Sequence, residues 1–222
     1  MKKVLKNVSF VYLLLKMCFV FGQEIGTQKV IVIDPGHGGK DSGALGINGI
    51  KEKDFVLDIA LEILKVNEQS EIPLEIYLTR YTDTLISLSD RTKLVKALNA
   101  DVFISLHCNH SDNPNARGIE VYVANGKSKY FEESTWLAYQ LQAEFKDRLG
   151  FESRGVKFAN FQVLRETQDY FPAVLLELGF LSNKDESKYY QKSKNLVITS
   201  RVLLEYLMRN FRKYGNSRNR DN

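Results

Sequence analysis

The chain has 222 residues, enough for one domain with a buried core, and its hydrophobic share of 44% and charged share of 26% are ordinary for globular proteins. The formal net charge of +4 comes from the first 22 residues, which hold four lysines and no acid, so the remainder is formally neutral. The charge therefore gives no reason to expect nucleic-acid binding. Only Cys108 lies outside that segment, which excludes a disulfide within the domain.

The first 22 residues have the form of a secretory signal peptide. Lysines precede an apolar stretch from Val8 to Phe21, and the small Gly22 offers a cleavage point. An uncleaved membrane anchor is the alternative, although the stretch is short for a membrane span. We expect export, to the periplasm in the first place, with secretion or envelope association as alternatives. The expected division is a signal peptide at 1–22, a lead-in at 23–28, the domain at 29–213 and a flexible tail at 214–222.

The rest of the chain alternates between short apolar runs and segments with helical periodicity. The runs predict strands at 29–34, 74–78, 102–106, 118–123 and 173–178, and a strand or extended segment at 155–164. Helices are expected from Lys51 or Glu52 to Val66, from Ser87 to Leu98, and over 131–149 and 196–211. This alternation predicts an α/β fold with a largely parallel sheet.

Three of the apolar runs lead into residues that bind or serve metals. His37 lies in a glycine-rich loop after the first run, His107 ends the third, and Glu177 lies within the last. The carboxyl ends of strands are where open α/β sheets place their sites. Two histidines and a carboxylate at one sheet edge are the material of a zinc hydrolase.

Each of these residues also has a plainer interpretation. His37 could be an ordinary loop histidine, and His107 a core histidine bonded to backbone. Glu52 could simply complement the dipole of the helix it opens, or become a third ligand if the glycine-rich loop folds back. Glu177 gives the strongest signal, because an unpaired buried charge is costly, although a backbone or arginine partner would also satisfy it.

Two further residues near His107 are less indicative. Neighbouring side chains on a strand point to opposite faces, so Cys108 is expected to be a small buried residue rather than a ligand. His110 is interpreted as a loop residue, with substrate contact as the alternative.

In combination, the motifs resemble those of the zinc-dependent N-acetylmuramoyl-L-alanine amidases of the AmiC type. The resemblance runs from about Lys29 to Arg212, in the order of the family's motifs. The segments that carry it are Asp34–Ala44, Glu52–Asp54, Leu78–Arg80, Leu88–Arg91, Phe103–Asn109, Val163–Arg165 and Pro172–Asn183.

The resemblance implies one Zn²⁺ held by His37, Glu52 and His107, with Glu177 as the catalytic carboxylate. It also implies a twisted, mainly parallel six-stranded sheet flanked by helices, of the phosphorylase/hydrolase-like kind. The expected reaction is hydrolysis of the amide between the lactyl group of muramic acid and L-alanine in peptidoglycan or muropeptides. Such activity serves cell-wall remodelling, cell separation or turnover.

The mechanism suggests roles for further residues. Three protein ligands leave a zinc position open for water, and Glu177 would exchange protons with that water and the leaving amine. Ring hydrogens of the histidines need acceptors, for which Asp34 and Asp41 are candidates. Arg165, expected at the end of its strand, is a candidate for a stem-peptide carboxylate, and Asn109 for another substrate contact.

Three rival interpretations remain at this point. They are a two-metal exopeptidase, a catalytically silent peptidoglycan-binding module and a plain structural domain. The first lacks assignable extra ligands, the second predicts a lost ligand, and the third leaves the metal-type residues unexplained. We expect a monomer with no nucleic-acid partner, membrane contact only through an uncleaved signal segment, and no helix that plugs the site. The need for a protein activator stays open.

Overall fold

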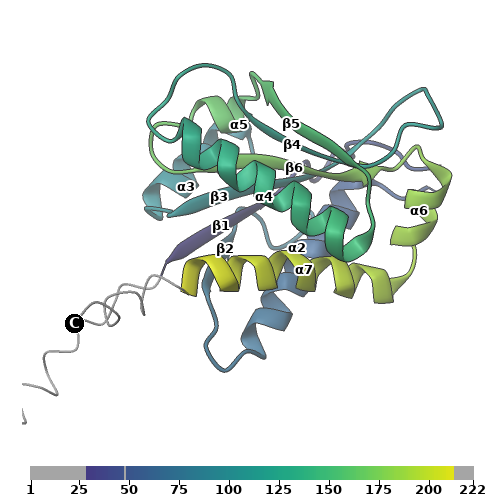
Figure 1. Ribbon diagram of the computed structural model, residues 1–222, viewed down its shortest axis with the longest axis horizontal. Helices are drawn as coiled ribbons and strands as arrows, with labels where there is room; N and C mark the ends of the chain where they lie inside the picture. The colour runs from purple at the N-terminus through teal and green to yellow at the C-terminus, as the bar shows by residue number, and fades with distance from the viewer. Residues whose placement is uncertain (1–28, 48, 213–222) are drawn as a thin grey trace, which may run out of the picture.

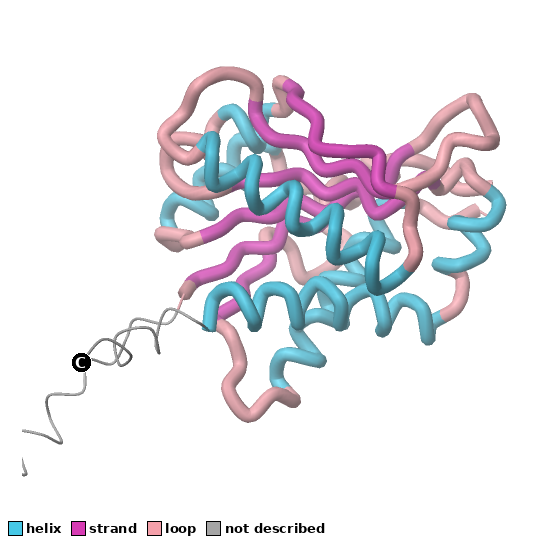
Figure 2. Tube along the Cα trace, viewed as in Figure 1, coloured by secondary structure: helices cyan, strands magenta, loops and turns pink. Residues whose placement is uncertain are grey.

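Six strands form one sheet, and helices pack on both of its faces (Figure 1). The strands are β1 (Val30–Pro35), β2 (Glu75–Leu78), β3 (Val102–Asn109), β4 (Ile119–Ala124), β5 (Ser153–Ala159) and β6 (Ala173–Phe180). The helices are α2 (Glu52–Glu68), α3 (Leu88–Ala97), α4 (Phe131–Leu149), α5 (Gln162–Arg165), α6 (Lys184–Tyr190) and α7 (Ser193–Arg212). Figure 2 shows the strands in magenta among the cyan helices.

The computed structural model describes residues 29–47 and 49–212. The predicted signal peptide, lead-in and tail lie outside the described residues. Within the described ranges, no helix combines the length and apolar character that crossing a bilayer requires.

The strand order is β2-β1-β3-β6-β4-β5. The neighbours among β2, β1, β3 and β6 are parallel, β4 runs antiparallel to β6, and β5 runs parallel to β4. The prediction of a six-stranded, mainly parallel α/β sheet flanked by helices is therefore confirmed.

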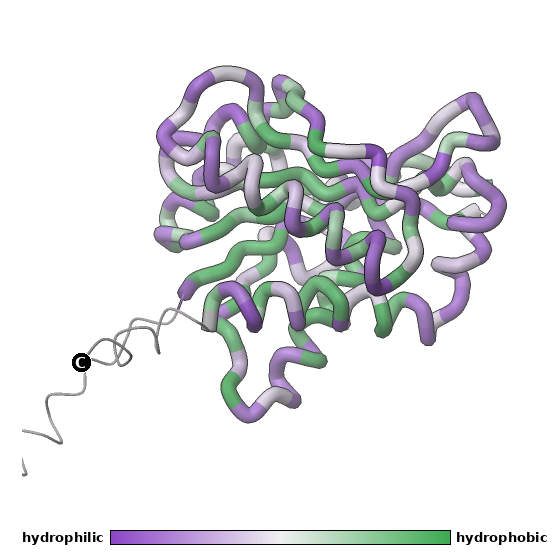
Figure 3. The backbone as a smooth tube through the Cα atoms, in the orientation of Figure 1, coloured by the Kyte–Doolittle hydropathy of each residue, from purple (hydrophilic) through white to green (hydrophobic). Residues whose placement is uncertain are grey.

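Apolar cores fill both sides of the sheet. Ile31 and Ile33 of β1 point into a core shared with α2, α4 and α7, whereas Val32 points into a second core shared with α3 and α5. Alternate side chains of a strand face opposite sides, so a strand covered on both faces has a continuous apolar sequence. This arrangement explains the unbroken hydrophobic runs of the central strands, which are green in Figure 3.

The structure corrects the prediction for residues 155–164. β5 ends at Ala159, where its pairing with β4 also ends, and the chain then forms the short helix α5. Val163 and Leu164 are buried in the core on the α3 side, which requires the chain to turn across the sheet rather than continue along its edge. Arg165 is therefore the last residue of a helix and not the end of a strand.

One helix was not predicted, and two strands are longer than predicted. Helix α6 was not predicted, because its seven residues are too few to show an apolar period, although Asn183 caps it by accepting hydrogen bonds from Asp185 N and Glu186 N. Strands β3 and β6 extend beyond their predicted ends, so His107 also lies within a strand, as was predicted for Glu177. A position inside a strand fixes the backbone of both residues more firmly than a loop would.

Candidate active site

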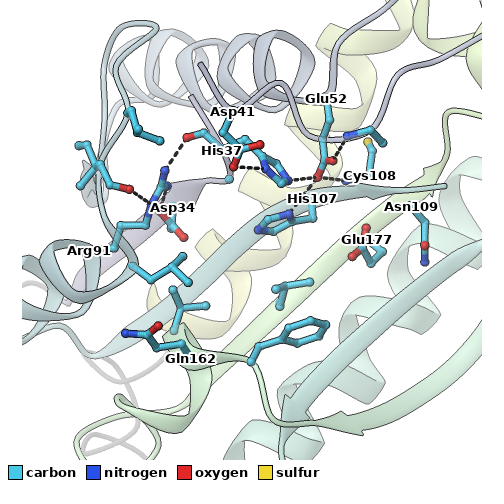
Figure 4. Close-up of a pocket in the computed structure, with 18 of the residues that line it drawn as sticks. Asp34, His37, Asp41, Glu52, Arg91, His107, Cys108, Asn109, Gln162 and Glu177 are labelled. Atoms are coloured by element: carbon cyan, nitrogen blue, oxygen red, sulfur yellow. Dashed lines mark hydrogen bonds and ion pairs between the residues drawn. The ribbon is translucent and has the colours of Figure 1, made fainter. Parts of the chain in front are cut away.

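His37, His107 and Glu177 line one cavity at the carboxyl ends of β1, β3 and β6 (Figure 4). The cavity has a volume of about 920 Å³. His107 and Glu177 are directly paired in the register of β3 and β6. The loop after β1 is attached to the same edge, because Gly36 N donates to Leu106 O over 3.0 Å. The parallel arrangement of these three strands thus brings the three side chains together.

The loop after β1 holds His37 in a left-handed backbone conformation, with φ of 60°. This conformation is uncommon for residues other than glycine, and such strain is concentrated at functional sites. Glycines 36 and 43 leave the space that the site occupies. A Cβ at Gly36 would lie 2.3 Å from His107 Cε1, and one at Gly43 would lie 2.5 Å from Glu52 Oε2. Any side chain at either position would displace the groups of the site.

Glu52 joins three parts of the fold although it is the first residue of α2. The glycine-rich loop folds back on the helix start, where Glu52 N donates to Ala44 O and Ala44 N donates to Glu52 Oε2. Glu52 Oε1 also accepts a hydrogen bond from Cys108 N on β3, over 2.9 Å. The residue is 3% exposed, so the helix dipole alone does not account for its position. The loop has folded back in the way that a ligand role for Glu52 requires.

Three donor atoms converge on one point between these elements. Glu52 Oε1 lies 3.0 Å from His37 Nε2 and 2.9 Å from His107 Nδ1. The two imidazole rings stand nearly perpendicular, at an interplanar angle of 78°. The ligand atoms of these three residues all lie within 4.8 Å of one another, which makes them a possible metal site. Two nitrogens and one carboxylate oxygen are a donor set typical of zinc.

Charge coupling within this set favours ionised forms. Burial alone would lower the pKa of His37, but hydrogen bonds and charge from Glu52 and Asp41 raise it to about 9. Burial would raise the pKa of Glu52, but hydrogen bonds from the two histidines lower it far below its usual value. His37 and Glu52 thus favour opposite charges where the donor atoms converge, and Glu52 supplies the negative charge that would attract a cation there.

Glu177 differs from Glu52 in having few partners. Its Oε2 is buried and has no hydrogen-bond partner among the described residues. Burial raises the pKa of Glu177 to about 7, with the neighbouring carboxylates Glu52 and Glu120 adding to the rise. An orphaned carboxyl oxygen in a cavity, with a pKa near neutrality, suits a group that exchanges protons with a substrate.

The two aspartates proposed as histidine partners have different surroundings. Asp41 Oδ2 lies 2.8 Å from His37 Nδ1, the ring nitrogen that points away from Glu52. Asp34 is buried and instead accepts hydrogen bonds from Arg91, Thr79 and Ser105. Its described hydrogen bonds therefore reach an arginine and two hydroxyls, and the interaction with a histidine falls to Asp41.

Two buried arginines, for which no role was predicted, support the loop. Arg91 joins Asp34 to the backbone by donating to the carbonyls of Pro35 and His37. Arg80 donates to the carbonyls of Pro35 and Gly36. Both are 2% exposed. Arg91 acts through the His37 backbone and positions the strained residue. Each cation lies in a motif segment, but nothing local in the sequence indicates its distant partners.

The remaining candidates lie at or beyond the cavity rim. Asn109 lines the cavity and donates to Glu120 Oε2 over 2.8 Å, and His110 lines it from the adjoining loop. Arg165 is exposed, donates to Asn160 and is not among the residues that line the cavity. Cys108 is buried in the apolar core and also lines the cavity, and it is not part of the possible metal cluster.

An α/β sheet with a cavity that holds a His–Glu–His cluster and an unpartnered carboxyl is an arrangement suited to a hydrolase, and the cluster could hold a metal ion. The family profile described as N-acetylmuramoyl-L-alanine amidase matches residues 31–203. The chain belongs to this family.

Curated relatives of the chain include cell-wall enzymes. The chain is 39% identical over 165 residues to N-acetylmuramoyl-L-alanine amidase LytC of Bacillus subtilis, covering 73% of this chain and 32% of LytC. The chain covers 61% of the length of the Endolysin of Bacillus phage SPP1. It covers 58% of the length of the probable cell wall amidase LytH of Staphylococcus epidermidis. The chain thus spans between about a third and three fifths of the lengths of these three relatives.

Solved structures share the fold over most of the chain. The catalytic domain of the amidase CwlV from Bacillus (Paenibacillus) polymyxa superimposes with a TM-score of 0.70 at 36% identity, covering 82% of this chain and 97% of that one. The CwlD amidase of Clostridioides difficile, in complex with the GerS lipoprotein, gives a TM-score of 0.70 at 27% identity, with coverages of 79% and 94%. These similarities lie over the part of the chain that holds the site.

Proposed function

We propose that the protein is a zinc-dependent N-acetylmuramoyl-L-alanine amidase of the AmiC type. It hydrolyses the amide between the muramic lactyl group and the first L-alanine of the stem peptide. The observation that carries the proposal is the convergence of the donor atoms of His37, Glu52 and His107 within 4.8 Å, in the cavity that Glu177 lines. Membership in the family indicates which bond is cut.

The residues fit one zinc ion. Three protein ligands with a remaining position for water or substrate are the usual composition of a catalytic zinc site. When bound, zinc supplies a Lewis acid that polarises the amide carbonyl and makes water more acidic. His37 would offer Nε2, His107 Nδ1 and Glu52 Oε1, the atoms that already face one another. Asp41 would hold a proton of His37 on Nδ1, and a bound metal would replace the proton on Nε2.

Glu177 is the general base and then the general acid. Its carboxylate accepts a proton from the water that attacks the lactyl carbonyl carbon, and the protonated carboxyl then gives a proton to the alanine nitrogen as the C–N bond breaks. The products are a muramic lactyl carboxylate and a free amino terminus. The unpartnered Oε2 supports this role, because no internal hydrogen bond has to be broken before the oxygen takes a proton.

Substrate contacts are proposed for residues at the rim of the cavity. Asn109 lines the cavity next to His107 and offers an amide to the stem peptide. Arg165 lies outside the lining and would reach only parts of the substrate that extend beyond α5. The cavity therefore recognises the atoms around the scissile amide, and residues beyond it recognise the more distant parts of the stem peptide.

The proposed place of action is the cell envelope, in wall remodelling, cell separation or turnover. Export would use the first 22 residues as a signal peptide. Peptidoglycan or muropeptides are the proposed substrates of a monomer. A protein activator has a precedent in CwlD, which was solved in complex with the GerS lipoprotein. Among residues 29–47 and 49–212, one cluster has metal-type ligands, which favours a one-metal amidase over a two-metal exopeptidase.

The test is digestion of purified sacculi by protein that lacks residues 1–22. New amino-terminal L-alanine and new lactyl carboxyls are expected, lost after chelation and restored by zinc. Glu52→Gln should lose zinc and activity together, because it removes one ligand charge. Absence of zinc from the wild-type protein would contradict the ligand assignment.

A matched histidine pair separates ligand loss from general damage. His107→Ala should abolish zinc binding, whereas His110→Ala, three residues away and outside the cluster, should bind zinc as the wild type does. Zinc binding without cleavage of sacculi or muropeptides would favour the silent binding module over the amidase.

A further inference from the structure

A second polar cluster lies beside Glu177 on the same face of the sheet. Its centre is Glu120 of β4, which is directly paired with Glu177 of β6 in the antiparallel register. The Glu120 side chain is 3% exposed. Its Oε1 accepts hydrogen bonds of 2.5 Å from Arg154 Nε and from Lys157 Nζ. Its Oε2 accepts hydrogen bonds of 2.8 Å from Asn109 and Tyr122.

An irregularity in the sheet brings the two cations to this carboxylate. The pairing of β4 with β5 shifts from Ile119↔Ser153 to Val121↔Val156, so that Arg154 and Gly155 both lie opposite Glu120. Such a bulge re-aims a side chain, and it is enriched next to active sites and at sheet edges. Lys157 reaches the same oxygen from the position opposite Tyr122. The edge strand β5 thus presents two cations to the face that holds the cavity.

The cluster carries more positive than negative charge. One buried carboxylate holds two cations, so one positive charge remains uncompensated within the group. The side chains of Arg154 and Lys157 are 33% and 36% exposed, which leaves both accessible to a ligand. Asn109 connects the cluster to the cavity, because it lines the cavity and donates to Glu120. Figure 4 shows Asn109 and Glu177 on neighbouring strands at this end of the site.

Two residues of an extended peptide span about 7 Å of the roughly 10 Å between β6 and β5, and the side chains of β5 can cover the rest. Neighbouring strands lie about 4.8 Å apart, so β4 and β5 lie about 5 and 10 Å from β6. An extended peptide advances about 3.5 Å per residue. A stem peptide that leaves Glu177 across β4 therefore carries its second residue to the region of Arg154 and Lys157. Arg165 lacks this relation to Glu177, because it lies on α5 and donates to Asn160.

We propose that Arg154 and Lys157 form a subsite for a carboxylate on the stem-peptide residue that follows the first L-alanine. Glu120 is a positioning residue that holds both cations on the open face. Arg154 donates through Nε to Glu120 and through Nη1 to Arg117 O, so its Nη2 and the Lys157 ammonium would bind the carboxylate through charge-assisted hydrogen bonds. The inference rests on the proposed amidase function and adds a preference for acidic over amidated stem peptides.

The test compares two synthetic muramoyl tripeptides. One has a free α-carboxylate on the second residue, and the other has a primary amide there. The zinc-loaded wild-type protein should cleave the acid with a kcat/KM about tenfold above that of the amide, the value of one charge-assisted hydrogen bond. Arg154→Gln and Lys157→Gln should each reduce this ratio to below about threefold, mainly by raising KM for the acid. Each variant leaves Glu120 one cation, so that the fold is preserved.

Arg117→Gln is the matched control. It removes an exposed cation next to β4, one whose closest acidic contact is Glu152 at 4.0 Å, and it should leave the ratio unchanged. Equal losses on both substrates, or the same loss in the control, would make the cluster structural and overturn the inference. A larger effect of Arg165→Gln on the ratio would assign recognition to that residue instead. Cleavage of both tripeptides without preference overturns the subsite alone, whereas cleavage of neither also overturns the amidase.

Discussion

Asp34 and Glu177 are two carboxylates on the same face of one sheet, with strand β3 between them, and their surroundings are opposite. Asp34 is 1% exposed and is held by Arg91, Thr79 and Ser105. Burial would raise the pKa of Asp34, but the Arg91 charge and these hydrogen bonds lower it below its usual value. Burial raises the pKa of Glu177 to about 7, and its Oε2 has no described hydrogen-bond partner.

The hydrogen-bond and ion-pair partners of a buried carboxyl, and not its burial alone, decide whether it stays ionised or titrates near neutral pH. A carboxylate with a cation and two hydroxyls stays ionised and organises the structure around it. A carboxyl without partners remains able to take and release a proton near neutral pH. Asp34 accordingly fixes the loop of His37 through Arg91, and Glu177 is left for chemistry.

The substitution of Glu177 should change the activity more than any of the substitutions that follow. Glu177→Gln should lower kcat on muramoyl peptides by about 10²- to 10⁴-fold, because the amide cannot accept the proton of the attacking water. Stability in urea should change by less than about 1 kcal/mol, since Oε2 of Glu177 has no hydrogen-bond partner among the described residues. Zinc content should equal that of the wild type. A variant that retains most of its activity would remove Glu177 from the mechanism.

The second largest effect is expected on stability, from the substitution of Asp34. Asp34→Asn should lower the free energy of unfolding by about 3–5 kcal/mol, because Arg91 is left buried without its counter-charge. Asp90→Asn, which changes an exposed aspartate that pairs with Lys93 at 3.3 Å, is the control and should leave the urea midpoint close to that of the wild type. Urea denaturation of both variants without metal measures the difference. Similar losses in the two variants would contradict the role given to Asp34.

A smaller effect is expected from the substitution of Asp41, an exposed carboxylate beside His37. Asp41 contacts His37 Nδ1 at 2.8 Å, and its side chain is 52% exposed. Asp41→Asn should weaken zinc binding by about tenfold, the lower end of the range for outer partners of metal ligands, because water partly replaces it. Competition with a zinc chelator gives the affinity. Asp112→Asn, an exposed change in the loop after β3, should have no effect, and equal weakening in both would point to a general charge effect.

The smallest effect is on the pH dependence of stability. The folded-state pKa of Asp34 is below its unfolded value, so its contribution is fully present above about pH 4 and is lost as the pH falls through the lowered pKa. The wild-type protein should therefore lose stability in acid more steeply than Asp34→Asn, by at most about 1.4 kcal/mol per pH unit. Urea midpoints from pH 5 to pH 2.5 measure the slopes. Parallel slopes would mean that Asp34 is not held ionised.

Much of the fold could be predicted from local patterns. The buried strands have continuous apolar sequences because both faces are covered, and the long helices show an apolar period because one face packs on the sheet. Helices α5 and α6, with four and seven residues, are too short for such a period. The sequence pattern therefore predicts a strand that reaches Arg165, although β5 ends six residues before it.

The candidate site was predictable in its residue types but not in its partners. His107 and Glu177 stood out because polar groups interrupt apolar runs. The partner of Asp34 is Arg91, 57 positions away, and the partners of Glu120 lie on β5. Such contacts follow from strand order and from a bulge, which no local pattern reports. For this reason the sequence does not distinguish Asp34 from Asp41 and gives no sign that Arg154 and Lys157 contact Glu120.

The most direct test of the central claim is digestion of muropeptides in water enriched in oxygen-18, followed by mass spectrometry of the products. If water adds to the lactyl carbonyl with Glu177 as the base, the muramic lactyl carboxylate gains one heavy oxygen and the released stem peptide gains none. The zinc-loaded Glu177→Gln variant should then yield almost no labelled product. Label in the peptide, in a sugar hydroxyl, or in equal amounts with the variant would contradict the proposed bond or the proposed base.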